Sequence, residues 1–483
     1  MNFISLRTFR VLRIRIRPCI CTVLWCAGIS LNACKHAPVE PPSGVILATV
    51  EEVNVAEGPH SVLSVVVTAT VRNAVQVAVE YGNESRLKQR TPAMVVSGGV
   101  ARVPVLGLHA NTNYELRAVA ISPSGHETRG GVLHFTTSAL PDDLPTFSIL
   151  TTDAPTPGFV MLGFATAGGA ATHYALLVDN RGEVVWYRGF PRPIMDFQKQ
   201  ENSQFIAYTS LDVASPSHFY QFDRLGEITG EFHATDGFTT GPHEFGLVAG
   251  GYFLFAIEHR PMDLTAVGGR PDADVRGTGI EYHRPNGEVF RWSPFEHLRV
   301  TDAVADIALD GEFVNPWHGN ALTLDRDGHF LVSFRNMDQV VKVNSRTGAV
   351  IWRLGGERSD FTFVDDPLGG FSHQHGVRRL PNGNIILFDN GNLHSPPFSR
   401  AAEYQLDEKN KIATLVWEFR HAPPLFSFAL GFAQRLANGR TLINYGTAQR
   451  VVEVDAAGKT RWEMTIQPAD AYPYRAFRLD SLY

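Results

Sequence analysis

"VDNRGEVVWY", residues 178–187, is a polar turn that leads into a short strand ending in Trp-Tyr, and it decides the fold because it recurs. The pattern returns as "FDRLGEITGEF" (222–232), "HRPNGEVFRW" (283–292), "VNSRTGAVIW" (343–352), "LDEKNKIATLVWEF" (406–419) and "VDAAGKTRWEM" (454–464). Five of the chain's seven tryptophans occupy the same place in these units. Such self-similarity indicates a fold built from equivalent modules.

A second element, a turn followed by an apolar strand, lies between these units. It reads "PGFVMLGF", "NSQFIAYT", "GGYFLFAIEH", "DGHFLVSFRN", "NGNIILFDNG" and "NGRTLINYG". The two elements alternate six times at intervals of about 45–60 residues, which predicts a six-bladed β-propeller of roughly four strands per blade over residues 146–483. The 43 glycines and 29 prolines agree with an all-β chain of strands and turns.

A smaller all-β domain precedes the propeller. Residues 45–140 contain short alternating strands, which predict a β-sandwich, and "LPDDLP" (140–145) is the linker. "LHANTNYELRAVAI" resembles the tyrosine corner of fibronectin type III domains, in which Tyr114 would anchor a loop. We expect this domain to be a spacer.

The first 33 residues have the features of an export signal. Five arginines precede the short apolar run "CICTVLWCAGIS", which is too short for a membrane-spanning helix. "LNAC" resembles a bacterial lipobox, in which Cys34 would be lipidated and become the new N-terminus. A plain cleaved signal is the alternative. Residues 34–44, which are rich in proline, would then form a tether. We therefore expect an exported protein that is lipid-anchored to the bacterial envelope, in the periplasm or at the cell surface.

Cysteine use and charge exclude several classes of function. All four cysteines lie within the first 34 residues, so the exported chain has no disulfide, cysteine metal site or thiol nucleophile. Without the leader it has 38 basic and 49 acidic residues, a net charge of −11. This balance argues against nucleic-acid binding and against any membrane attachment other than the lipid anchor. The sequence leaves the oligomeric state open.

Three histidines occur near one position of the blade repeat. His375 and His243 each lie eight residues before the glycine of their blade's turn, and His318 lies ten before its glycine. If the first strand of each blade lines the channel, three consecutive blades place a histidine at the same channel mouth. Arg335, in "LVSFRN", ends a neighbouring strand and is expected at that mouth. The repeated placement favours a catalytic site over isolated structural histidines.

Two other motifs are expected to be structural. "DRDG" (325–328) has the acids of a calcium loop but falls in a blade turn. His373 should face away from His375 on an extended strand. No nucleotide-binding loop or nucleophile elbow is present, so we expect neither a cofactor nor a metal.

Longer stretches resemble the bacterial arylsulfate sulfotransferase family. They are "WHGNALTLDRDGHFLVSFRNMDQVVKVNSRTGAVIWRLGG", "QHGVRRLPNGNIILFDNGN", "SRAAEYQLDE" and "YPYRAFRLDSLY". The resemblance implies a six-bladed propeller that moves a sulfuryl group from a phenolic sulfate ester to a phenolic acceptor through a sulfated histidine, without a nucleotide. It implies that His375 is the nucleophile and that His318, Asn320, Arg335 and His243 surround the sulfuryl oxygens.

These residue types suit the chemistry. Sulfuryl transfer should resemble loose phosphoryl transfer, which needs positioning and donors aimed at the equatorial oxygens. A neutral His375 would attack sulfur and give ping-pong kinetics, while His243 or His318 would exchange the phenol proton. Two alternatives remain: a propeller that only binds partners, and a metal enzyme that uses the three histidines. Arg335 argues against the metal.

Lipidation of Cys34 is tested by labelling cells with a fatty-acid probe. The wild-type protein should carry the label and Cys34→Ala should not, because the thiol is the acylation site. An unlabelled wild type would indicate a cleaved, soluble product instead.

Overall fold

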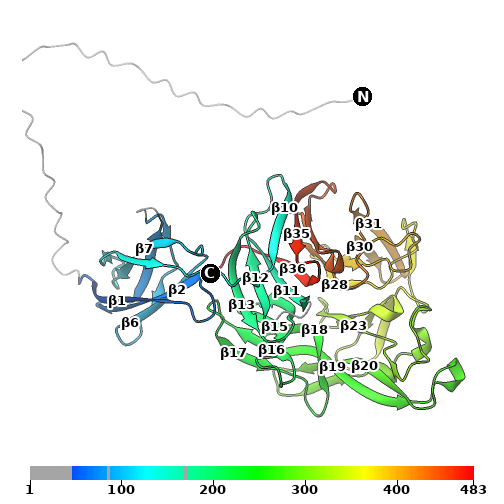
Figure 1. Ribbon diagram of the computed structural model, residues 1–483. Helices are drawn as coiled ribbons and strands as arrows, with labels where there is room; N and C mark the ends of the chain where they lie inside the picture. Colours follow the sequence, from blue (N-terminus) through cyan, green and yellow to red (C-terminus); the bar gives the residue numbers. More distant parts are fainter. Residues whose placement is uncertain (1–45, 84–86, 168–171) are drawn as a thin grey trace, which may run out of the picture. The chain divides into compact units, whose positions relative to one another are not determined.

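The computed structural model describes residues 46–83, 87–167 and 172–483, which are built mainly of strands (Figure 1). The predicted export signal (1–33), the lipidation site Cys34 and the tether (34–44) lie outside the described residues. In the part of the chain that the structure describes, no helix has the length and apolar character needed to cross a membrane.

Residues 49–136 form the expected β-sandwich. One sheet contains β1 (Thr49–Glu57), β2 (Ser64–Arg72) and β6 (Val100–Leu106); the other contains β3 (Gln76–Gly82), β4 (Gln89–Arg90), β5 (Met94–Val95), β7 (Asn113–Ile121), β8 (Glu127–Arg129) and β9 (Leu133–Thr136). The Tyr114 hydroxyl accepts a hydrogen bond of 2.9 Å from the backbone N–H of His109. Tyr114 therefore anchors the preceding loop, as expected.

The remaining described strands form six blades, which confirms the predicted propeller. From the innermost strand outward, blade one contains β36 (Ala471–Leu479), β11 (Phe159–Ala167), β12 (His173–Val178) and β13 (Val184–Phe190), and blade two contains β14 (Met195–Lys199), β15 (Phe205–Thr209), β16 (His218–Phe222) and β17 (Ile228–Phe232). Blade three contains β18 (Thr239–Val248), β19 (Gly251–Met262), β20 (Ala273–His283) and β21 (Val289–Trp292), and blade four contains β23 (Gly319–Leu324), β24 (Phe330–Phe334), β25 (Gln339–Val343) and β26 (Val350–Leu354). Blade five contains β28 (His375–Arg379), β29 (Ile385–Asp389), β30 (Arg400–Asp407) and β31 (Ile412–Arg420), and blade six contains β32 (Phe432–Arg435), β33 (Thr441–Asn444), β34 (Arg450–Val454) and β35 (Thr460–Gln467).

Short elements decorate this ring. β10 (Thr146–Thr152) pairs with β35, β22 (Phe313–Val314) with β20, and β27 (Thr362–Val364) with β31. The 3-10 turns are η1 (Thr265–Val267), η2 (Pro294–Glu296), η3 (Val300–Asp302), η4 (Arg335–Met337) and η5 (Gly446–Ala448).

The C-terminal strand closes the ring. In blades two to six the first strand in chain order is the innermost, as the repeat predicted. β10 precedes blade one in the chain but belongs to the sheet of blade six, where it pairs with β35. In blade one the innermost strand is instead β36, which pairs antiparallel with β11 (Figure 1, red and cyan). Successive inner strands are neighbours around the ring, with β36 between β32 and β14. The last strand of the chain therefore lines the channel.

The recurring tryptophans connect each blade to the next. Each stands on the fourth strand of its blade, counted from the channel, and its indole N–H donates to the third-to-fourth-strand turn of the following blade. The bonds run from Trp186 to the Arg224 carbonyl, Trp292 to Gly348, Trp352 to the Glu408 carboxylate, Trp417 to Ala456 and Trp462 to Asn180. Blade two has Phe232 at this place. The tryptophan of one repeat thus binds the polar turn of the next, and Trp462 joins blade six to blade one.

Replacement of Trp462 by phenylalanine tests this contact. Trp462 is fully buried and donates a 2.9 Å hydrogen bond to Asn180, so the change leaves a gap and an unpaired carbonyl. We expect the free energy of unfolding in urea to fall by about 2–4 kcal/mol. Trp417→Phe is the matched control: its bond is longer, at 3.2 Å, and solvent reaches it. It should cost no more than about 0.5 kcal/mol; equal losses would contradict the proposed role of Trp462.

Candidate active site at one end of the channel

The three histidines meet at one end of the channel, where the repeat places them. His243 lies on β18, His318 directly precedes β23, and His375 begins β28, so they stand on the inner strands of three successive blades. The rings of His243 and His318 are 5.1 Å apart between centroids. Burial lowers the pKa of His243, and the nearby rings of His318 and His375 lower it further.

The surroundings of His375 select one neutral tautomer. Its Nδ1 is 2.7 Å from the side-chain oxygen of Asn390, whose own amide N–H groups donate to the carbonyls of Ser427 and Leu430. With the Asn390 amide fixed in this way, its oxygen can only accept, so Nδ1 of His375 carries the proton. The lone pair is therefore on Nε2, which accepts a long 3.3 Å hydrogen bond from the backbone N–H of Leu430.

Gly376 permits this placement of His375. Its φ is +65°, and a Cβ there would stand 2.5 Å from the Phe432 ring of blade six. Any other residue would be strained and would clash. Glycine after the histidine of "QHGV" therefore has a structural reason.

His318 has the opposite tautomer. The Asn315 side-chain oxygen accepts the backbone N–H of His318, so the Asn315 amide nitrogen faces His318 Nδ1 and donates to it at 2.9 Å. The proton of a neutral His318 is therefore on Nε2, which makes that atom a donor. His318 also has φ +45°, a conformation that costs energy in a non-glycine residue and is concentrated at functional sites.

His243 is oriented by Tyr474 of the closing strand β36. The Tyr474 hydroxyl lies 3.1 Å from the His243 carbonyl and 3.3 Å from the Asn320 carbonyl, so it donates to one of these. Its oxygen then accepts from His243 Nδ1 at 2.9 Å. This arrangement leaves the lone pair of His243 on Nε2, where a proton can be taken up.

Burial keeps all three imidazoles neutral. Desolvation is the main cause that lowers each pKa, and it is reinforced by Arg335 at His318 and His375. The pKa of His318 falls to about 3 although its side chain is partly exposed, and those of His243 and His375 fall well below the usual 6.5. The site therefore presents neutral imidazoles, each with one donor and one acceptor nitrogen, at physiological pH.

Arg335 and Asn320 are both held by backbone carbonyls. Arg335, in η4, donates from Nη1 to the Asn336 side chain and from Nη2 to the Phe428 carbonyl. Asn320 is fully buried and donates to the Gln374 carbonyl at 2.8 Å, which ties β23 to the segment before β28. Arg335 thus reaches the histidines by its charge, whereas the Asn320 amide is engaged within the channel wall.

The predicted conformation of His373 is wrong. β28 begins at His375, and His373 precedes it with φ +55°, so it is not on an extended strand. It is buried with Nε2 3.2 Å from Asp306 and its backbone N–H bonded to Asp338. The reason is that the carboxyl groups of Asp306 and Asp338 hold this segment in a turn. His373 also lies close enough to His318 to lower the pKa of that histidine.

Sequence reasoning missed the residues that orient the histidines. Asn390 follows the blade-five strand in "FDNGN", and Tyr474 lies in "YPYRAF", but nothing in either local pattern indicates a histidine partner. Arg276 on β20 was also missed; its charge lowers the pKa of both His243 and His318. The signal for Asn390 and Tyr474 was that each occurs in a stretch that resembles the family, "QHGVRRLPNGNIILFDNGN" and "YPYRAFRLDSLY".

The "DRDG" turn is an ion-pair cluster, at the opposite end of β23 from His318. Asp325 is bound by Lys342 at 3.0 Å and by Arg379 at 2.7 Å, and these cations lower its pKa to about 2. Among the described residues, no group of three His, Cys, Asp or Glu is arranged to hold a metal ion.

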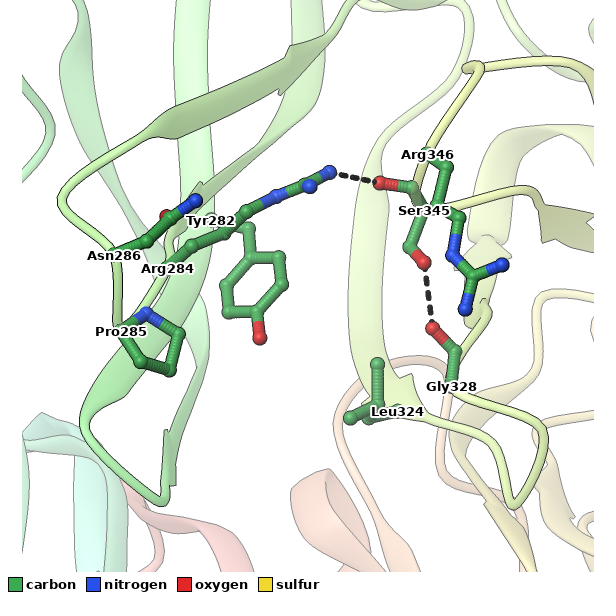
Figure 2. A pocket seen from close by; sticks show the side chains of 8 residues that line it. All are labelled: Tyr282, Arg284, Pro285, Asn286, Leu324, Gly328, Ser345 and Arg346. Carbon is green, nitrogen blue, oxygen red and sulfur yellow. Dashed lines mark hydrogen bonds between the residues drawn. The ribbon is translucent and has the colours of Figure 1, made fainter.

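A pocket of about 340 Å³ lies at that opposite end, between blades three and four (Figure 2). Its walls include Tyr282 and Arg284 on one side and Ser345 and Arg346 on the other, and Arg284 donates to the Ser345 carbonyl across it. None of the candidate site residues lines this pocket.

The chain is a six-bladed β-propeller with three neutral histidines and an arginine at one mouth of its channel. The family model described as "Arylsulfotransferase (ASST)" matches residues 154–475, two thirds of the chain. The chain belongs to this arylsulfotransferase family, and family membership supports arylsulfotransferase activity in general. No curated protein matches the chain.

Solved structures with similar folds are distant. A protein of unknown function from Bacteroides caccae is 13% identical with a TM-score of 0.42, and the match covers 66% of this chain and 98% of that one. A catalytically inactive virginiamycin B lyase from Staphylococcus aureus, solved with quinupristin, is 10% identical with a TM-score of 0.37, covering 68% and 92%. Such likeness says nothing about function.

Proposed function

We propose that this protein transfers a sulfuryl group from a phenolic sulfate ester to a phenolic acceptor through a sulfated His375, without a nucleotide cofactor. The observation that carries the proposal is the fixed tautomer of His375. Asn390 holds the proton on Nδ1, which leaves the lone pair on Nε2, where its one hydrogen bond, from the Leu430 N–H, is long at 3.3 Å. A neutral imidazole with an oriented lone pair is a competent nucleophile at pH 7.

In the first half-reaction the Nε2 lone pair of His375 attacks sulfur while the bond between sulfur and the aryl oxygen breaks. The phenolate leaves with the bonding electrons, and His375 keeps the Nδ1 proton bonded to Asn390. His318 Nε2–H is suited to donate a hydrogen bond to a developing negative oxygen, because a neutral imidazole donates without needing to be protonated. Arg335 adds a positive charge near the sulfuryl oxygens.

In the second half-reaction an acceptor phenol attacks sulfur and the bond between sulfur and Nε2 breaks, which returns neutral His375. The phenol proton needs a base. His243 is the better candidate of the two, because Tyr474 leaves its Nε2 lone pair free whereas Nε2 of His318 already carries a hydrogen. This assigns different roles to two histidines that the sequence could not distinguish.

We also propose that the reaction takes place outside the cytoplasm, with the chain anchored through Cys34. This proposal rests on the arginine-rich leader and on "LNAC". A transferase that needs no nucleotide is compatible with such a compartment.

A burst experiment tests the nucleophile. A chromogenic aryl sulfate added without acceptor should release about one equivalent of phenol per enzyme, because the first half-reaction needs no acceptor. Acid-quenched mass spectrometry should then find the sulfuryl group on the peptide that contains His375. His375→Ala should lose burst and turnover, and Arg335→Ala should slow the burst by ~10²–10³-fold.

The matched control for His375→Ala is His421→Ala. His421 is a partly buried histidine whose ring nitrogens contact Pro423 and Glu463 and none of the candidate site residues. This variant should keep both burst and turnover. A sulfuryl group on another residue, or normal turnover by His375→Ala, would overturn the proposed function.

The pH dependence of kcat/KM provides a separate prediction. Burial and Arg335 lower the pKa of His375 well below 6.5, so the nucleophile stays neutral as the pH falls and is lost only when the pH passes below that lowered value. We expect kcat/KM for the donor at pH 6 to lie within about twofold of its value at pH 8. An ordinary pKa of about 6.5 would reduce it to roughly one quarter at pH 6.

A further inference from the structure

Arg276 is a second guanidinium at the histidine cluster. It lies on β20, and its charge lowers the pKa of His243 and of His318. Thr278, two residues along on the same face of this regularly paired strand, packs against Gly319, the residue after His318: a Cβ on Gly319 would stand 2.9 Å from its methyl carbon. The backbone therefore places Arg276 on the face of blade three that packs against the start of β23, directly after His318.

Arg276 has no ion-pair partner among the described residues, and its Nε is buried without a hydrogen-bond acceptor. Desolvation lowers its pKa, and the group that raises the pKa is a phenol, that of Tyr208. The other arginines near the channel differ. Arg475 contacts Asp196 and Glu244. Burial lowers the pKa of Arg335, but the nearby carboxyl groups of Asp306 and Asp338 oppose that shift.

An unpaired, largely buried cation is unfavourable for the folded protein unless something compensates for its charge. A sulfate monoester carries one negative charge, so it would supply the negatively charged partner that Arg276 does not have among the described residues. Arg335 is less suited to that role, because Asp306 and Asp338 lie near it and two of its five N–H donors are already bonded to the protein.

We propose that Arg276 binds the negatively charged sulfate group of the donor ester before reaction, an inference that rests on the proposed function. The planar guanidinium offers paired donors to two sulfate oxygens, in the same way that arginine binds carboxylate and phosphate. Arg276 then acts in substrate binding, while Arg335 acts near the nucleophile during transfer.

Direct binding of an unreactive aryl sulfonate, p-toluenesulfonate, tests the proposal by calorimetry on the full-length protein. Arg276→Gln should weaken binding by roughly 10- to 100-fold, as expected for loss of a charged donor. The same variant should raise KM for the aryl sulfate by a similar factor and change kcat little, because the interaction exists in the ground state. Unchanged affinity for the sulfonate would overturn the proposal.

Thermal unfolding separates this role from a structural one. Because Arg276 has no partner to lose, Arg276→Gln should leave Tm unchanged or raise it while binding weakens. A structural arginine would lower Tm on removal, and a marked fall in Tm with unchanged sulfonate affinity in the folded fraction would contradict the proposal. If Arg276→Gln does not fold, Arg276→Lys replaces it: the loss of the planar fork should still weaken binding, and wild-type affinity would count against Arg276.

Arg260→Gln is the matched control. Arg260 lies in the same blade but pairs with Glu258 and Glu296 at the surface, so its variant should bind the sulfonate normally. The two proposals fail separately. If the burst on His375 is absent but sulfonate binding depends on Arg276, the proposed reaction fails and the anion site stands. If the burst occurs but Arg276→Gln binds as wild type does, only this inference fails.

Discussion

The ion pairs of Arg475, buried in the central channel, are the interaction on which the rest of the propeller depends. Arg475 belongs to the last strand of the chain, β36, and contacts Asp196 on β14 and Glu244 on β18. It also donates to the Asn320 carbonyl on β23, and Arg378 on β28 pairs with the same Glu244. One guanidinium therefore connects inner strands of four blades. Such a buried network is favourable only when every charge has its partner, so it forms only when the ring is closed.

Closure of the ring also completes the candidate active site. Tyr474, the residue before Arg475, orients His243 and approaches the carbonyl of Asn320. The last strand of the propeller thus supplies both the charge at the centre of the channel and the hydroxyl that fixes one histidine. The buried tryptophans connect successive blades at the fourth strand of each sheet, far from the channel, and so hold the ring together at its periphery. Stability and site geometry consequently share the same contacts.

The electrostatics of the channel mouth follow from burial. Three imidazoles and two guanidinium groups lie together there, and mutual repulsion together with desolvation keeps the imidazoles neutral. A neutral imidazole has one donor and one acceptor nitrogen, and the neighbouring amide or hydroxyl decides which is which. Asn390, Asn315 and Tyr474 therefore determine how three chemically identical side chains differ in what they can do.

The sequence by itself determined the six blades and the meeting of His243, His318 and His375, because both follow from a repeat whose period is set by local turn and strand patterns. It also determined the family resemblance, which the family match over residues 154–475 confirmed. Only the tertiary structure decided that β36 closes blade one, that His373 lies in a turn, and which tautomer each histidine has. These features depend on contacts between residues more than a hundred positions apart, such as Tyr474 with His243, or on a single side chain such as Asn390, whose role no local pattern records. Local patterns fix the period of a repeat, whereas the state of a side chain depends on whatever the folded chain places beside it.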